Sequence, residues 1–329
     1  MRLKKILKGF SREGDILKNK LLIIVGPTAV GKTDTSIELA KHLNGEIISA
    51  DSMQIYKYMN IGTAKPTTSE MQGIPHHLIN VVEPNEVFTA ADFQKQAEKT
   101  IAKVISRNKL PIIAGGTGLY INSIIYDMDF TSTVSNWPLR KKLQEDAAKY
   151  GNDYIHNELK KIDADAANRI HKNNVKRVIR AIEIFHESGE KIKDFQKDLK
   201  LNNKYDFTLI GLTRDRQELY DRINQRVDIM IKDGLINEVS NLLNNGYDEN
   251  LISFKGLGYK EIISYIKYDI SLDETIEVLK RDTRRYAKRQ LTWFKRLEDI
   301  QWYNLSQYDS KENLITHIIK YIKGHFEDL

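Results

Sequence analysis

The chain has 329 residues, 41% hydrophobic and 29% charged, the composition of a soluble globular protein with one large domain or two. The lack of cysteine excludes disulfides and thiolate metal sites, and no apolar run reaches the roughly 18 residues of a membrane span, so we expect a cytoplasmic protein without a membrane partner. Lys and Arg (51) outnumber Asp and Glu (45), and the isoelectric point near 9.0 permits a polyanionic partner without requiring one.

Residues 1–20 are a basic N-terminal extension, with Leu3, Ile6, Leu7 and Phe10 at helical spacing among lysines. This pattern fits a peripheral basic helix better than a membrane-surface helix or a transit peptide. We assign it no function.

A phosphate-binding loop follows the first apolar run, Leu21–Val25, and matches the pattern G-x-x-x-x-G-K-S/T. The two glycines let the backbone approach a phosphate closely, the lysine supplies positive charge, and the threonine hydroxyl is a ligand for Mg²⁺. The helix expected to start here points its positive dipole end at the same anion. The predicted phosphate-binding residues are Gly26, Pro27, Thr28, Ala29, Val30, Gly31, Lys32 and Thr33, with Thr33 as the metal ligand.

A second apolar run, Glu46–Ala50, ends at Asp51. Ligands of an open parallel sheet bind beyond the carboxyl ends of its strands, so Asp51 is expected beside the phosphate loop. A carboxylate there can be a partner of Mg²⁺ or a general base, and its position does not choose between the two roles.

A third strand, Pro111–Ala114, runs into the turn Gly115-Gly-Thr-Gly118, which can present N–H donors and the Thr117 hydroxyl to an anion. Before it, Phe88–Asn108 has the stripe of an amphipathic helix. The adjacent His76 and His77 would face opposite ways in a strand, so we expect them to pack or hydrogen-bond in a loop and not to form a metal site.

From about residue 128 to 203 the chain is polar and helical in pattern, without a strong strand, and we interpret it as an insertion into the α/β core. Lys176 and Arg180 share a helix face there, which suits phosphates or a solvated surface equally. We therefore divide the chain into the extension (1–20), the first part of the core (21–127), the insertion (128–203) and the rest of the core with basic C-terminal helices (204–329).

The core resumes with the strand Phe207–Leu212, and Arg214 or Arg216 at its end can reach the phosphate pocket. Further helices are predicted at 219–232, at 237–244, after the turn 255–260 and at 272–296, followed by an edge strand at 299–304. The long helix interleaves basic residues with Tyr286, Trp293 and Phe294, a combination that suits nucleic acid because cations neutralise phosphates and rings stack on bases.

These features describe an α/β protein with a phosphate-binding parallel-sheet core of the P-loop NTPase type, a helical insertion and added C-terminal helices. Its second substrate can be a polynucleotide. The loop reads phosphates and not what carries them, so the sequence pattern leaves open whether a nucleoside triphosphate such as ATP or another diphosphate binds.

The chain resembles the bacterial tRNA dimethylallyltransferase family in eight motifs between about residues 21 and 296. They are Gly26–Thr33, Asp51–Gln54, Ile61–Pro66, Pro75–Leu78, Gly115–Tyr120, Arg177–Glu183, Gly258–Glu261 and Tyr286–Trp293. Val30, where the family has serine or another small residue, and the N-terminal extension depart from the pattern. A change at position 30 can alter the lining of the pocket.

The resemblance implies transfer of a dimethylallyl group from dimethylallyl diphosphate to the exocyclic amine of the adenosine just 3′ of the anticodon in tRNA, with Mg²⁺ and release of diphosphate. It implies that Asp51 is the base and that Lys32 and Thr28 act at the diphosphate. Thr117 and Arg140 match family positions where the two substrates meet. We expect the adenine to be flipped out of its stack.

The resemblance also implies contacts with the anticodon stem and loop, and we expect a monomer. The implied tRNA-binding residues are Asp51, Ser52, Met53, Gln54, Lys176, Arg177, Arg180, Arg285, Lys288, Arg289 and Gln290.

Three other functions remain alternatives at this point. A small-molecule kinase needs the same loop and Asp51 but does not explain the basic helices. A non-catalytic nucleic-acid-binding protein explains those helices but leaves Asp51 without a task. A prenyltransferase acting on free adenine nucleotides is the nearest alternative, and a comparison of AMP with tRNA as acceptor distinguishes it.

Overall fold

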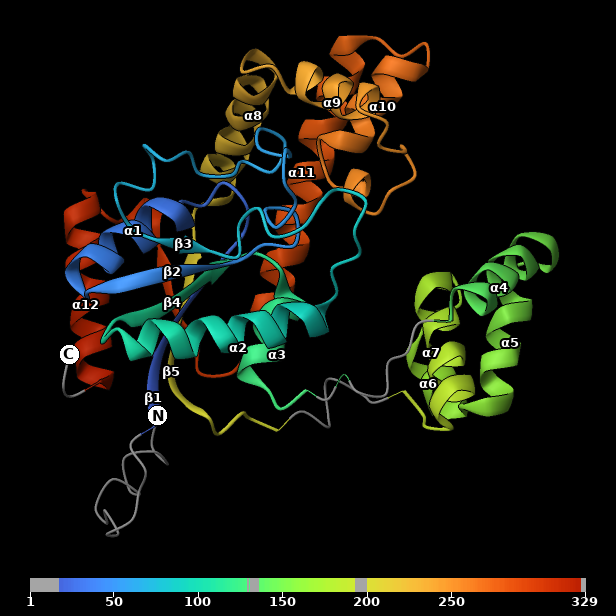
Figure 1. The fold of residues 1–329 in the computed structure, drawn as a ribbon, viewed down its shortest axis with the longest axis horizontal. Coiled ribbons are helices and arrows are strands. Elements are labelled where there is room, and N and C mark those ends of the chain that lie inside the picture. Colours follow the sequence, from blue (N-terminus) through green and yellow to red (C-terminus); the bar gives the residue numbers. More distant parts are fainter. Residues whose placement is uncertain (1–17, 129, 131–135, 193–199, 327–329) are drawn as a thin grey trace. The chain divides into compact units, whose positions relative to one another are not determined.

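The computed structural model describes residues 18–128, 130, 136–192 and 200–326 (Figure 1). Most of the predicted basic extension, residues 1–17, lies outside the described residues. The chain forms two compact units, one made of the residues up to 124 and from 202 onward, and the other of Ile125–Leu201. Each unit is described by itself below. No described helix is both long and apolar enough to cross a membrane.

The larger unit is built on a parallel sheet, which confirms the predicted α/β fold class. Among the described residues the sheet has six strands in the order β3-β2-β4-β1-β5-β6, all paired in parallel. The strands are β1 (Asn19–Val25), β2 (Gly45–Ala50), β3 (His76–His77), β4 (Leu110–Gly115), β5 (Tyr205–Thr213) and β6 (Gln301–Asn304). The carboxyl ends of β2, β4 and β1, three adjacent strands, therefore meet at one edge of the sheet.

Helices cover both faces of this sheet (Figure 1). On one face α1 (Lys32–His42) and α12 (Lys311–His325) share a hydrophobic cluster with alternate residues of the strands, such as Leu22 and Ile24. The other face is covered by α2 (Ala90–Ser106), whose buried stripe includes Phe93 and Ile101, and by the short α3 (Gly118–Ile125). Because residues of β1 and β2 are buried on both faces, these strands read as continuous apolar runs in the sequence.

Four more helices of this unit pack on the long segment between β2 and α2. They are α8 (Arg216–Lys232), α9 (Leu235–Asn244), α10 (Tyr259–Lys267) and α11 (Leu272–Phe294). Their shared hydrophobic cluster also contains Ile55, Tyr56 and Met59 of that segment. The Glu238 carboxylate accepts hydrogen bonds from the amides of residues 60, 61 and 62 and from the Tyr259 hydroxyl. This anchoring explains how a segment with little regular structure is held in place.

The smaller unit is a helical bundle of α4 (Trp137–Tyr150), α5 (Asn152–Ile162), α6 (Ala164–Arg169) and α7 (Val175–Ser188). Residues such as Leu143, Ile155, Leu159 and Ile182 form its core. The sequence placed the insertion at 128–203, nearly the same stretch.

The edge strand β3 and the helix α12 of the larger unit were not predicted from the sequence. The edge strand β3 is only two residues long, too short to show a period of two. The helix α12 has a clear apolar face, on which Leu314, Ile318 and Ile322 are buried. It lies beyond the last sequence motif, and no helix was predicted there.

Candidate active site

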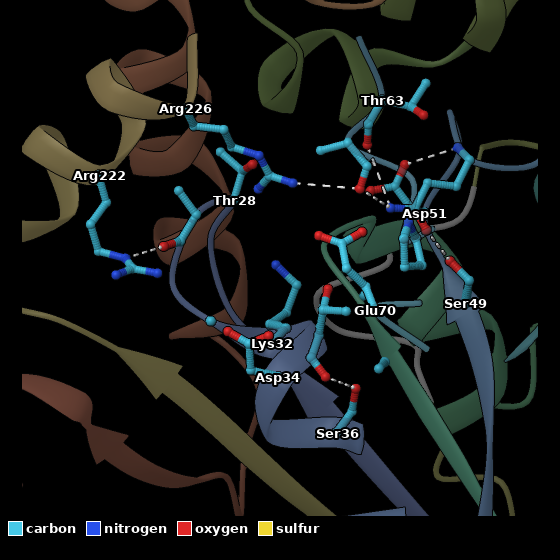
Figure 2. Close-up of a pocket in the computed structure, with 18 of the residues that line it drawn as sticks. Thr28, Lys32, Asp34, Ser36, Ser49, Asp51, Thr63, Glu70, Arg222 and Arg226 are labelled. Atoms are coloured by element: carbon cyan, nitrogen blue, oxygen red, sulfur yellow. Dashed lines mark hydrogen bonds between the residues drawn. The ribbon is translucent and has the colours of Figure 1, made fainter. Parts of the chain in front are cut away.

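A cavity of about 460 Å³ opens at the carboxyl edge of the sheet in the larger unit (Figure 2). It is lined by the phosphate loop, the end of β2, the segment from residue 63 to 76, the end of β4, and inward faces of α8 and α11. The charged side chains that line it are Lys32, Asp34, Asp51, Glu70, Arg222 and Arg226. The cavity thus brings three cations and three carboxylates together where strand order predicts a ligand site.

The phosphate loop has the geometry of an anion-binding helix start. Gly31 precedes α1 with a φ of 108°, a conformation that favours glycine, and no side chain caps the first turn of the helix. The free N–H groups of this turn and the helix dipole favour an anion at the cavity. Lys32 Nζ donates to the carbonyl oxygens of Gly26 and Pro27, at 3.0 and 2.8 Å.

Burial changes the protonation of Lys32. The pKa of its ammonium is lowered from 10.5 to about 8, mainly because burial removes water; the Asp51 carboxylate partly opposes this effect, and the nearby Arg226 adds to it. Asp51 is therefore close enough to Lys32 to interact with it electrostatically. An arriving diphosphate would stabilise the charged ammonium in the same way.

The Asp51 carboxylate is oriented by the backbone that follows it. Its Oδ1 accepts hydrogen bonds from the amides of Met53 (2.9 Å) and Gln54 (3.4 Å). This turn fixes one oxygen against the backbone, and Figure 2 shows the carboxylate among the side chains that line the cavity. Gln54 also lines the cavity and is held by Ser49.

Thr117 lies next to this turn and is not among the residues that line the cavity. Its hydroxyl accepts from the Ser52 amide at 3.0 Å and donates to Ser52 Oγ at 3.3 Å. The glycine turn from which Thr117 comes serves close packing: a Cβ on Gly116 would lie 2.2 Å from the Gln290 side chain, and one on Gly118 would lie 2.3 Å from Trp293. The anion-binding role predicted for this turn stays a prediction.

Two arginines that the sequence analysis did not assign, Arg222 and Arg226, reach the cavity from α8 (Figure 2). They are four residues apart and share one face of the helix. The Arg222 Nε donates to the carbonyl of Ala29 at 3.0 Å, so it also ties the helix to the phosphate loop. Burial lowers the pKa of Arg226, whose charge the Asp51 carboxylate favours.

The sequence analysis held that Arg214 or Arg216 can reach the phosphate pocket, and Arg214 does contact the phosphate loop. Arg214 pairs with Glu218 and donates to the carbonyl of Val30, and Arg216 packs over the Tyr220 ring. Neither lines the cavity. The i, i+4 spacing of Arg222 and Arg226, which puts both on one face of a helix, is the signal that the sequence offered for them.

The remaining residues of the phosphate loop divide between the cavity and the core. Thr28, Ala29, Gly31 and Thr33 line the cavity. Gly26, Pro27 and Val30 are buried. Val30 belongs to the hydrophobic cluster under the sheet, so its departure from the family pattern does not change the lining of the cavity, contrary to the expectation above.

The cavity suits a hard divalent cation that arrives with a diphosphate. No group of three or more His, Cys, Asp or Glu side chains suited to a metal exists among the described residues. The Thr33 hydroxyl and the Asp34 carboxylate, both at the start of α1, are oxygen donors in the cavity. Mg²⁺ prefers such donors, keeps several waters and is completed by phosphate oxygens. The donor set therefore fits a magnesium-diphosphate.

Helix α11 presents different side chains inward and outward. Tyr286 and Gln290 line the cavity, and burial raises the pKa of the Tyr286 hydroxyl. Arg285, Lys288 and Arg289 are exposed on the same helix. The exposed residues form a basic surface, which suits phosphate groups.

The predicted site residues of the smaller unit lie on its helices. Arg140 and Arg180 both pair with the fully buried carboxylate of Glu183, and the Arg140 guanidinium lies over the Trp137 ring. These pairs satisfy the buried charge. Lys176 and Arg177 are exposed in the first turn of α7.

A parallel α/β core, a Gly-Lys-Thr loop at a helix start and a cation-lined cavity with an aspartate at the next strand end define the class of P-loop enzymes that bind di- or triphosphates. The sequence pattern of the IPP transferase family matches residues 54–297. The chain belongs to the IPP transferase family.

Relatives resemble the chain over nearly its whole length. It is 66% identical to a tRNA dimethylallyltransferase of Alkaliphilus oremlandii over 313 residues, 95% of this chain and 100% of that protein. A tRNA dimethylallyltransferase of Alkaliphilus metalliredigens is 62% identical, with 94% and 99% covered.

Solved structures agree with the fold. The full-length tRNA isopentenylpyrophosphate transferase of Bacillus halodurans is 45% identical with a TM-score of 0.72, covering 94% of this chain and 98% of that one. A eukaryotic dimethylallyltransferase acting on tRNA is 30% identical with a TM-score of 0.79, covering 93% and 80%.

Proposed function

We propose that this protein transfers the dimethylallyl group of dimethylallyl diphosphate to the exocyclic amine of the adenosine 3′-adjacent to the anticodon in tRNA, releasing diphosphate. One observation carries the proposal: Lys32 of the phosphate loop and Asp51 of the next strand end line the same cavity and interact electrostatically. A leaving diphosphate and a proton acceptor are the two requirements of this substitution. Family membership and the named relatives supply the substrates.

The reaction balances with these residues. The adenine nitrogen attacks the first carbon of the dimethylallyl group, and a carbon–nitrogen bond forms while the carbon–oxygen bond to diphosphate breaks. The electron pair of the broken bond leaves with the diphosphate, and Asp51 accepts the proton that the nitrogen loses. Lys32, Arg222, Arg226 and the N–H groups at the start of α1 stabilise the growing charge on the leaving group. Bound Mg²⁺, with Thr33 as a ligand, supplies further positive charge at the diphosphate.

The tRNA is proposed to contact basic residues of both units. In the larger unit these are Arg285, Lys288 and Arg289, which are exposed on α11. Residues 52–54, which follow the general base Asp51, are proposed to contact the tRNA as well. In the smaller unit they are Lys176, Arg177 and Arg180, and Arg140 acts where the substrates meet. We further propose that the protein acts as a monomer in the cytoplasm.

The test uses the whole chain with dimethylallyl diphosphate, Mg²⁺ and unmodified tRNA, followed by mass analysis of the nucleosides. We expect a prenylated adenosine with tRNA and none with AMP. Asp51→Asn keeps the oxygen that accepts from Met53 and Gln54 but loses the charge. This variant should turn over about 10²–10⁴-fold more slowly, with unchanged tRNA affinity. Undiminished product from it would contradict the role of Asp51.

The kinase alternative has its own signature. Phosphoryl transfer from ATP to a small molecule in the absence of RNA, without prenylated tRNA in the first assay, would favour it. The same loop and carboxylate would then serve a nucleoside triphosphate.

A further inference from the structure

Gln290 of α11 lies between the phosphate loop and the glycine turn at 115–118. Its side chain is 6% exposed and makes two hydrogen bonds to backbone far away in sequence. Its Oε1 accepts from the Thr28 amide at 2.9 Å, and its Nε2 donates to the Gly116 carbonyl at 2.9 Å. The chemistry fixes this orientation of the amide, since a backbone N–H only donates and a backbone carbonyl only accepts.

The first bond leads to Lys32. The Thr28 N–H and the Pro27 carbonyl belong to one peptide group, which is planar and turns as a unit. Its N–H is held by Gln290 and its carbonyl accepts from Lys32 Nζ at 2.8 Å. The orientation of this peptide group therefore sets where the ammonium lies.

The second bond leads to Asp51 by the same logic. The Gly116 carbonyl and the Thr117 N–H share a peptide group, and that N–H donates to the Ala50 carbonyl at 3.1 Å. The Ala50 carbonyl in turn shares a peptide group with the Asp51 amide. Gln290 thus connects to the residue bearing the base through two planar groups.

We propose that Gln290 is a positioning residue, which fixes the Lys32 ammonium and the Asp51 carboxylate relative to each other through these peptide groups. The inference rests on the proposed function, and it replaces the predicted contact of Gln290 with tRNA because both ends of the amide are bonded inside the protein. Its helix also carries exposed Arg285 and Arg289, so tRNA bound there would act on the helix that holds both catalytic segments.

The amide of Gln290 donates with its nitrogen and accepts with its oxygen, and both functions are used here. Gln290→Met keeps the length and the packing but removes the hydrogen bonds to Thr28 and Gly116, together with the one that the Gln290 side chain makes with Tyr286. Gln290→Glu keeps the bond to Thr28 and sets a carboxylate against the Gly116 carbonyl. Without one or both of these bonds, the peptide groups that position the Lys32 ammonium and the Asp51 carboxylate are free to turn, so we expect kcat to fall about tenfold to a hundredfold in both variants.

Three measurements separate positioning from other roles. We expect the midpoint of thermal unfolding of Gln290→Met to stay within a few degrees of the parent, its tRNA affinity to stay within about threefold, and its affinity for magnesium-pyrophosphate to fall with kcat. The matched control is Gln217→Met, an exposed glutamine whose side chain donates to Asp221 one turn away on α8. It should equal the parent throughout.

A second test of the proposal changes Gly116. Its Cβ in Gly116→Ala would lie 2.2 Å from Gln290 Nε2 and 3.7 Å from the Gly26 carbonyl, so the amide must move. This variant should lose as much kcat as Gln290→Met. In Gln290→Ala the space is free, so adding Gly116→Ala should cost nothing more, which is the non-additivity expected of residues in contact.

Parental kcat and pyrophosphate affinity in Gln290→Met would overturn the inference, and so would a loss explained by weaker tRNA binding or by unfolding. If the parent protein does not prenylate tRNA, the proposed function fails. The magnesium-pyrophosphate affinity of Gln290→Met then still tests whether this glutamine positions the phosphate loop.

Discussion

The low pKa of Lys32 predicts how the reaction depends on pH. With a pKa of about 8 in the unliganded site, this ammonium is mostly charged at pH 7 and mostly neutral at pH 9. The charged fraction falls about tenfold over this interval. Because kcat/KM reports the groups of the enzyme before the varied substrate binds, kcat/KM for dimethylallyl diphosphate should fall by the same factor.

The same pKa implies a stability effect of known sign. A lysine whose pKa is lowered on folding destabilises the folded state below that pKa, and the penalty disappears as pH rises from about 8 to 10.5. The lowering of this pKa from 10.5 to about 8 corresponds to a loss of folding stability of about 3 kcal/mol at most. Lys32→Met should therefore abolish turnover while raising the free energy of unfolding at pH 7 by about 1–3 kcal/mol. The lost bonds to Gly26 and Pro27 reduce the gain.

The assay is initial rate against dimethylallyl diphosphate at saturating tRNA, from pH 7 to 9.5, for the parent and Lys32→Arg. Arginine stays charged over this range, so the falling limb should vanish in the variant whatever its absolute rate. Burial lowers the pKa of Lys65 to about 8 as well. A falling limb caused by Lys65 would persist in Lys32→Arg, so the comparison distinguishes the two lysines. A flat profile in the parent, or the same limb in Lys32→Arg, would refute the reasoning.

Arg226→Met removes a cation that lines the cavity near Asp51, so the KM for dimethylallyl diphosphate should rise about tenfold to a hundredfold. Steady-state kinetics measures this KM. Glu238→Ala leaves three amides and a hydroxyl without an acceptor and should lower the free energy of unfolding by about 2–4 kcal/mol in denaturant titrations. Replacing Arg285 and Arg289 together with methionine should weaken tRNA binding and make the slope of log K against log salt shallower by about 2.

Each of these predictions has a control and a contradicting result. Glu277→Ala, an exposed carboxylate paired only with Lys280, should leave stability unchanged, and equal stability of the Glu238 variant would refute the anchoring role. A salt slope that stays at the parental value would exclude phosphate contacts by the α11 surface. An unchanged KM in Arg226→Met would remove this arginine from the diphosphate site.

Sequence reasoning located the parts of the site that are local in the chain. The Gly-Lys-Thr loop is diagnostic because strand, loop and helix follow one another within about fifteen residues, and apolar runs mark strands buried on both faces. The rule that ligands bind beyond the ends of parallel strands then placed Asp51 near Lys32. The structure has both residues in one cavity.

Local patterns could not supply the side chains that come from distant helices. Arg222 and Arg226 line the cavity from α8, whereas the partly buried Arg214, nearer to the end of β5, pairs with Glu218 and bonds to the Val30 carbonyl. The contact of Thr117 with Ser52 and the packing of its glycine turn against α11 also join residues far apart in the chain, so the sequence did not predict them.

By itself the sequence determined the parallel core, the phosphate loop and the carboxylate at the next strand end, since each depends on the order of neighbouring residues and on strand geometry. Only the tertiary structure decided that Gln290 meets Thr28 across 262 residues and Gly116 across 174. The physical reason is that hydrogen-bond partners of buried amides are chosen by how helices pack on the sheet. No periodicity along the chain encodes that choice.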